Sequence, residues 1–177
     1  MIKKIMTLLL VISLCACSSG YELRKQTFTF ELGDDVYANA SNYIKDPEKY
    51  NLKNVKVRAL SQGIRVKENR FVSGSKDYLV CGEYNFELVD GKKETKFRIK
   101  VKDTKPPTLS EDVTEIKIAA GSGFAWQDYL KASDLSGVSY SFAPIVDTTI
   151  AGSTDVTVKI YDRFGNTVEK VVTVKVE

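Results

Sequence analysis

The feature that most limits what this chain can fold into is a repeated alternation of large apolar and polar residues. The alternation has the two-residue period of a β-strand. It is clearest in the runs at 84–88 and 97–101, which lie on either side of Asp90-Gly91. Asp-Gly between two such runs predicts a hairpin, because both turn residues must tolerate a positive φ. No helical pattern is long enough to bridge parallel strands, so the sequence predicts an all-β fold of antiparallel strands.

Similar alternation continues through the rest of the chain. Further strands are predicted at 27–32, 55–59, 64–66, 116–118, 138–142, 156–160 and 172–176. The apolar residues at 43–44 and 124–130 are too few or too broken for a full helix. We interpret them as single helical turns or loops.

The segment Asp103-Thr104-Lys105-Pro106-Pro107 divides the patterned sequence into two halves. Two prolines without backbone N–H groups cannot continue a central strand, so this segment is predicted to be a domain boundary. Each half begins with an alternating strand and a glycine, followed by Asn42-Tyr43-Ile44-Lys45 in the first and Asp128-Tyr129-Leu130-Lys131 in the second. This repeat predicts two tandem antiparallel β-sandwiches, at 21–103 and 104–177.

The N-terminal segment has the pattern of a secretory leader: Lys3 and Lys4, an apolar run at 5–14, and a small residue, Ala16. Leu14-Cys15-Ala16-Cys17 resembles the lipobox of bacterial lipoproteins, although Cys15 stands where Ala, Ser or Thr is commoner. The resemblance implies removal of residues 1–16, attachment of a diacylglyceryl group to the Cys17 thiol, and a lipidated tether at 17–20. The alternative is an ordinary signal peptide with an incidental cysteine.

A lipobox implies a protein anchored by lipid at the extracytoplasmic face of the cell membrane. Asp does not follow Cys17, so the chain carries no inner-membrane retention signal of the enterobacterial kind. A Gram-positive surface is favoured, and an outer membrane is the alternative.

Composition excludes several classes of function. Without the two lysines of the leader, 24 basic residues face 23 acidic ones, which argues against a nucleic-acid partner. The chain has no histidine, which removes histidine-dependent triads, Cys-His dyads and the commonest zinc ligand. Cys81 has no cysteine partner in the mature chain and is expected to pack as a small buried apolar residue rather than to act as a nucleophile.

The second half resembles the bacterial immunoglobulin-like domains that form arrays on surface proteins. The residues that carry this resemblance are Asp134-Leu135-Ser136-Gly137-Val138, Val146-Asp147-Thr148, Gly152 and Asp162-Arg163-Phe164-Gly165-Asn166. Asp103 to Pro107 resembles the joint between such domains, and the first half matches less well. The resemblance implies a stalk, adhesion or protein-interaction module that is not an enzyme and has no catalytic residue or cofactor. Membrane lipid at the anchor and an extracellular protein or glycan are the expected partners.

Two surface features have alternative interpretations. Phe124, Trp126 and Tyr129 could form a stacking platform for a sugar, which would make the chain a carbohydrate or cell-wall polymer binding module. Residues three apart on a helical turn share a face, so we favour a role in the core. The mixed charges from Lys92 to Lys102 are interpreted as the solvated face of an edge hairpin, with contact to anionic lipid or cell-wall polymer as the alternative.

Two groups of acidic residues are candidates for chemistry. Asp34 and Asp35 are adjacent in a turn, whereas the paired carboxylates of glycosidases come from separate elements. In an immunoglobulin-type sandwich, Asp134, Ser136, Asp162 and Asn166 would gather beside Asp103, a set of hard oxygens suited to calcium. Asp and Asn also satisfy turn backbones by themselves, so no metal site is assigned.

Overall fold

The computed structural model describes residues 20–177, which form an all-β molecule. The first half contains β1 (Thr27–Glu31), η1 (Ala40–Asn42), η2 (Pro47–Lys49), β2 (Lys56–Ala59), β3 (Ile64–Lys67), β4 (Arg70–Ser73), β5 (Gly82–Asp90) and β6 (Lys93–Lys102). The second half contains β7 (Thr108–Leu109), β8 (Glu115–Ile118), α1 (Trp126–Tyr129), β9 (Ala132–Ser133), β10 (Ser139–Ala143), β11 (Gly152–Tyr161) and β12 (Thr167–Val176).

Each half is built on one four-stranded sheet and one two-stranded sheet. The strand order is β1-β6-β5-β2 in the first large sheet and β10-β11-β12-β8 in the second. The small sheets are the hairpin β3-β4 and the pair β7-β9. The predicted all-β sandwich fold is therefore confirmed.

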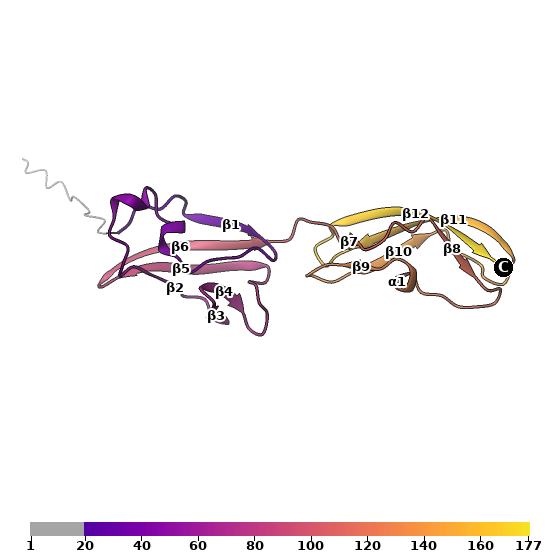
Figure 1. Cartoon of the computed structure of the whole chain (residues 1–177), viewed down its shortest axis with the longest axis horizontal. Helices are drawn as coiled ribbons and strands as arrows, with labels where there is room; N and C mark the ends of the chain where they lie inside the picture. Colours follow the sequence, from indigo (N-terminus) through magenta and orange to yellow (C-terminus); the bar gives the residue numbers. More distant parts are fainter. Residues whose placement is uncertain (1–19) are drawn as a thin grey trace, which may run out of the picture.

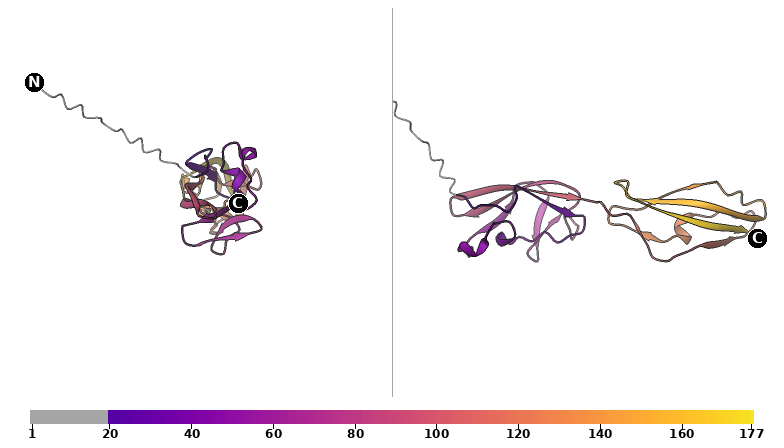
Figure 2. Two further views of the ribbon diagram at one scale, coloured as in Figure 1. Left: turned by 90° about the vertical axis from the view of Figure 1, so that its left-hand side faces the viewer. Right: turned by 90° about the horizontal axis from the view of Figure 1, so that it is seen from above.

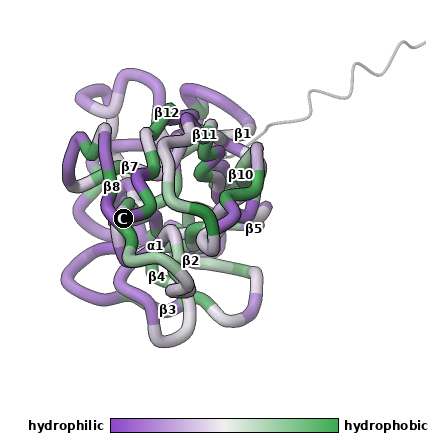
Figure 3. The backbone as a smooth tube through the Cα atoms, turned by 90° about the vertical axis from the view of Figure 1, so that its right-hand side faces the viewer, coloured by the Kyte–Doolittle hydropathy of each residue, from purple (hydrophilic) through white to green (hydrophobic). Residues whose placement is uncertain are grey.

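Two separate apolar cores fill these sandwiches. Alternation places Phe86, Phe97 and Ile99 on the inner face of the first sheet, where each is at most 2% exposed. The second core is aliphatic and is made by Ile116, Ile118, Val156, Val158, Ile160, Val172 and Val174, with Trp126 and Leu130 closing it. Hydrophilic residues predominate in the loops around the periphery (Figure 3).

One strand in each large sheet departs from the predicted antiparallel pairing. β1 runs parallel to β6, with Phe28 opposite Ile99, and β8 runs parallel to β12, with Ile116 opposite Val174. In each half the last strand, β6 or β12, therefore has a parallel neighbour from the earlier part of that half, β1 in the first and β8 in the second. As a consequence β5 and β6 are the two central strands, so the prediction that Lys92 to Lys102 belongs to an edge hairpin is wrong.

The hairpin turns differ in detail from the sequence pattern. Asp90 pairs with Lys93, so the two-residue loop is Gly91-Lys92, and Gly91 has a φ of 59°. Gly at the first loop position is typical of a type II′ turn, which needs one positive φ rather than two. In the β3-β4 hairpin, which was predicted only in part, Glu68 and Asn69 both have positive φ, as a type I′ turn requires.

The two sandwiches lie end to end (Figures 1 and 2). β6 ends at Lys102, and the chain passes through Asp103–Pro107 into β7. The described chain starts at one end of the molecule and its C-terminus lies at the other (Figure 1).

The predicted leader at 1–16 and the lipidation site Cys17 lie outside the described residues. Within residues 20–177, no helix combines the length and apolar character needed to span a membrane.

Candidate functional site at the joint between the sandwiches

Three carboxylates from distant parts of the chain meet at the joint. Asp103 follows β6, Asp134 follows β9 and Asp162 follows β11, and each places a carboxylate oxygen within 4.8 Å of the others. The predicted gathering of these residues at the end where the chain enters the second sandwich is therefore what the structure shows.

Asp162 is held by the turn that precedes β12. It is 3% exposed, and its Oδ1 accepts hydrogen bonds from the backbone N–H groups of Phe164 (2.8 Å) and Asn166 (2.9 Å). The Asn166 amide donates to its Oδ2 at 2.6 Å. Burial alone would raise the pKa of Asp162, but the hydrogen bonds from Asn166, Phe164 and Gly165 lower it below its ordinary value. Asp162 is therefore ionised at neutral pH, and its carboxylate accepts more hydrogen bonds than the carboxylates of Asp103 and Asp134.

Asp134 is held in a similar way. Its Oδ1 accepts hydrogen bonds from the backbone N–H and the hydroxyl of Ser136, both at 2.7 Å, and Gly137 completes the turn with a φ of 103°. Ser136 and Asn166 therefore donate to the carboxylates of their own turns. This is the turn-forming role that the sequence analysis gave as the alternative to calcium binding.

Asp103 is different, because it belongs to the joint and not to a turn. Its carbonyl accepts a hydrogen bond from the Asn166 amide at 3.1 Å, which fixes the joint to the second sandwich. Its carboxylate Oδ2 is buried and has no hydrogen-bond partner among the described residues. Three carboxylates of this kind offer hard oxygen ligands suited to calcium or magnesium. The assignment of no metal stays a prediction.

A second set of contacts fixes the joint to the first sandwich. Glu31, the last residue of β1, accepts hydrogen bonds from the backbone N–H of Thr104 at 2.6 Å and from its hydroxyl at 2.8 Å. These bonds lower the pKa of Glu31, the backbone bond most strongly. The sequence analysis missed this contact, because nothing in the local sequence shows that β1 ends beside the joint.

Leu135 of the second sandwich contacts the first sandwich directly. Its Cδ1 lies so close to Gly33 that a Cβ at that position would be 2.6 Å away, and its carbonyl faces the hydroxyl of Tyr78 at 3.4 Å. A cleft of about 410 Å³ lies beside the cluster, with Glu31, Asp103, Asp134 and Leu135 in its lining, while Asp162 does not line it.

The other predicted site residues have structural roles. Trp126 is 3% exposed and packs in the second core with Phe124 and Tyr129 beside it, so these rings form no flat platform. Asp34 accepts a hydrogen bond from the backbone N–H of Glu31. Cys81 is half-buried against the first core, and burial raises the pKa of its thiol, as expected for an apolar packing role.

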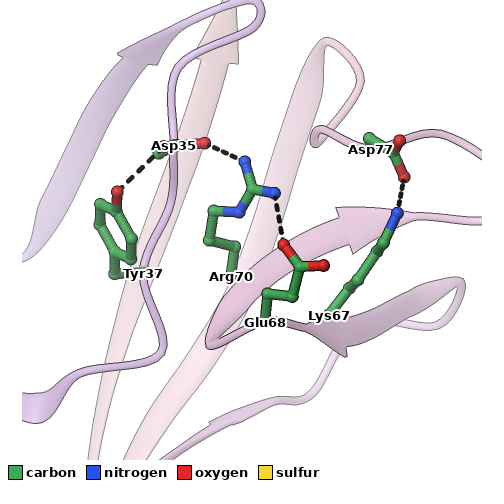
Figure 4. A network of polar contacts seen from close by, with 6 residues as sticks. All are labelled: Asp35, Tyr37, Lys67, Glu68, Arg70 and Asp77. Carbon is green, nitrogen blue, oxygen red and sulfur yellow. Dashed lines mark hydrogen bonds and ion pairs between the residues drawn. The ribbon is translucent and has the colours of Figure 1, made fainter.

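Asp35 pairs with a strand that the sequence analysis did not predict. Its carboxylate accepts hydrogen bonds from Arg70 of β4 at 2.6 Å and from Tyr37 at 3.0 Å (Figure 4). Arg70 also pairs with Glu68 in the β3-β4 turn. Asp35 thus attaches the small hairpin to the segment that follows β1, while Asp34 closes a turn, so the two carboxylates serve different elements.

Comparison with known proteins finds no match among protein-family models and none among curated proteins. Among solved structures, the chain is similar to human mucin-like protocadherin EC1-2, with 12% identity, a TM-score of 0.33, and coverage of 88% of this chain and 97% of that one. Protocadherin gamma C5 EC1-3 has 10% identity and a TM-score of 0.36, with coverage of 86% and 66%. Drosophila N-cadherin EC1-4 has 12% identity and a TM-score of 0.33, with coverage of 88% and 49%, so the chain spans about half of that structure. Values this low describe a distant likeness in fold and imply no shared function.

Proposed function

We propose that this chain is a non-catalytic lipoprotein of the bacterial cell surface, anchored through Cys17 at the extracytoplasmic face. Its two immunoglobulin-like sandwiches form a short stalk that presents the second sandwich to an extracellular protein. One observation carries the proposal: the chain enters the first sandwich at one end and leaves it at the opposite end, so the two sandwiches extend away from the anchor in line.

The entry point is defined by contacts of Tyr21. Its backbone N–H donates to the Thr95 hydroxyl at 3.0 Å, and its own hydroxyl donates to Asp90 at 2.8 Å. Both partners lie at the turn end of the β5-β6 hairpin. β6 then runs ten residues to Lys102 at the joint, a distance of roughly 30 Å at the usual rise per residue.

The anchor itself must be close to the first sandwich. Ser18, Ser19 and Gly20 are the only residues between Cys17 and Tyr21. Four extended peptide units reach at most about 14 Å. A lipid chain on Cys17 would therefore hold the hairpin end near the bilayer and direct the joint and the second sandwich outward.

Exchange of the anchor cysteine tests the proposed localisation. We expect the full chain, expressed in a bacterium that processes lipoproteins, to incorporate an acyl label and to sediment with membranes. Cys17→Ser should lose the label and accumulate as unprocessed precursor, whereas Cys15→Ser is the matched control and should be processed normally. Normal acyl labelling of Cys17→Ser would overturn the proposal of a lipid anchor.

A second experiment separates a stalk from a polymer-binding module. Residues 20–177 are incubated with purified cell-wall polymer and with a glycan array. A stalk that presents a protein-binding surface should bind neither. Saturable binding to one glycan would replace the stalk by the carbohydrate or cell-wall polymer binding module.

A further inference from the structure

The two sandwiches carry opposite net charges, which the nearly neutral total conceals. Residues 21–102 contain 17 Lys and Arg against 12 Asp and Glu, whereas residues 103–177 contain 7 against 11. The sandwich next to the proposed anchor is therefore basic, and the distal one is acidic.

The excess positive charge includes a group of four lysines at the anchor end. Lys92 is in the β5-β6 turn and Lys93 follows it, Lys56 pairs with Val89 near that turn, and Lys53 is in the loop before β2. The loop is placed here by Tyr50, whose ring packs edge-on against Tyr21 at 5.2 Å between centroids. All four lysines are exposed, and none forms an ion pair within residues 20–177. We call them the anchor-end lysines.

Most acidic residues at this end are already engaged. Glu22 pairs with Lys45 and Asp46 with Lys49, while Arg58 is shared by Glu87 and Glu94. Asp90 accepts a hydrogen bond from the neutral Tyr21 hydroxyl, which leaves its charge in place. Glu48 forms no ion pair within the described chain. Four lysines thus face three uncompensated acidic charges, those of Glu48, Asp90 and one of the two carboxylates that share Arg58, so this end keeps a small net positive charge.

We propose that the anchor-end lysines bind the anionic phospholipid headgroups of the membrane that holds the anchor. This inference depends on the proposed lipid anchor for its biological setting, because a short tether on Cys17 brings these lysines to the headgroups. Lysines near an anionic membrane surface are attracted to it within about a Debye length, roughly 8–10 Å at ordinary ionic strength. The tether reach is of the same order.

The acidic second sandwich adds to this effect. The same negative surface potential would repel the second sandwich, which has four more acidic than basic residues, whenever that sandwich came within about a Debye length of the membrane. The anchored chain therefore stands with its first sandwich on the membrane and its second sandwich away from it. The charge distribution orients the stalk, while the lipid only attaches it.

Vesicle flotation tests the proposal without the anchor. Residues 20–177 are mixed at low ionic strength with vesicles of phosphatidylcholine alone or of phosphatidylcholine with phosphatidylglycerol. We expect flotation with the anionic vesicles only, and loss of it as salt is added. Replacing Lys53, Lys56, Lys92 and Lys93 by Gln should weaken flotation at least roughly tenfold.

The chain offers a matched control for this variant. Lys76, Lys105, Lys131 and Lys159 are also exposed and form no ion pair in the described residues, but they lie away from the anchor end. Their replacement by Gln changes the net charge equally and should leave flotation within about twofold of the original. All eight side chains are solvated, so circular dichroism should be unchanged in both variants.

Three results would overturn the proposal: absence of flotation with anionic vesicles, equal flotation with both vesicles, or an equal loss in the control variant. These outcomes are separate from the acylation test, because the fragment lacks Cys17. Failure of flotation with normal acylation would leave the anchored stalk without electrostatic orientation. Flotation without acylation would show a peripheral membrane protein instead.

Discussion

The Glu31 carboxylate accepts two hydrogen bonds from Thr104, at 2.6 and 2.8 Å, and so joins the end of β1 to the segment between the sandwiches. The contact spans 73 residues of sequence. It depends on β1 pairing in parallel with β6, since only then do the two strands end side by side at the joint.

This contact predicts a pH dependence. The pKa of Glu31 is lowered from its ordinary value of 4.5 by the bonds from Thr104, so its stabilising contribution is complete above that value and is lost as the pH falls through the folded-state pKa. Glu31→Gln lacks this contribution. We expect wild type to be more stable than Glu31→Gln in urea at neutral pH, and the difference to shrink below the ordinary pKa. Glu48→Gln is the control, and an equal pH profile for both variants would contradict the prediction.

The contact between Gly33 and Leu135 predicts a local change at the joint. Gly33 has a φ of 90°, so Gly33→Ala should cost roughly 1–2 kcal/mol of unfolding free energy. Gly63 has a φ of 76° with open space around it, so Gly63→Ala should cost a similar amount. Only Gly33→Ala should also displace Leu135, whose Cδ1 would lie 2.6 Å from the new Cβ. The Leu135 methyl resonances should shift in Gly33→Ala alone, and an equal shift in both variants would contradict this contact.

The three carboxylates at the joint predict the effect of removing one charge. In chelator, Asp103→Asn should raise the unfolding free energy by about 1 kcal/mol, the scale of two unit charges at such a separation in water. The exposed Asp128→Asn is the control and should have little effect.

Melting should be the same in millimolar calcium and in chelator if the cluster only forms turns. A calcium site would instead be established by a rise of about 2.7 kcal/mol in the unfolding free energy with calcium at one hundred times its Kd, provided that Asp103→Asn abolishes the rise.

The separate cores predict that the two halves unfold independently. The protein has one tryptophan, Trp126, and it lies in the second core, so its fluorescence reports on that sandwich. Phe86→Ala removes a fully buried ring that packs against Phe71 at 4.8 Å, and it should destabilise the first sandwich by about 3–5 kcal/mol. We expect circular dichroism to show an earlier transition while the fluorescence midpoint is unchanged. A shifted fluorescence midpoint would mean that the chain unfolds as one unit.

The predicted domain limits, 21–103 and 104–177, lead to a related test. We expect limited proteolysis to cut first near Asp103 to Pro107 or in the exposed loop around 46–54. The fragment from Pro106 to Glu177 should fold alone and give a dispersed amide spectrum. A fragment without dispersion would place the boundary elsewhere.

Local pattern predicted the long strands well, because alternation in the sequence directly specifies the buried face. Phe86, Phe97 and Ile99 are inward as predicted, and Gly91 forms the hairpin loop. The β3-β4 hairpin was only half predicted. β4 carries the adjacent buried residues Phe71 and Val72 and has no two-residue alternation. Its type I′ turn contains Glu68, which is an uncommon residue at positive φ.

The candidate site was predicted in part for a similar reason. Asp134 and Asp162 lie in turns whose sequence is characteristic, so their position at the end of a sandwich followed from the fold class. The roles of Glu31 and Leu135 could not be predicted from the local sequence or from the fold class, because each depends on contact with a residue far away in sequence.

By itself, then, the sequence determined the all-β class, the proline joint and the acidic turns, since period-two alternation, missing N–H groups and turn propensities act over a few residues. Only the tertiary structure decided that β1 pairs in parallel with β6, that Glu31 accepts hydrogen bonds from Thr104, and that the four anchor-end lysines lie at the same end of the first sandwich. These features depend on which strands become neighbours. That choice is made by burial of the whole core, to which no single segment contributes enough free energy to specify its partner.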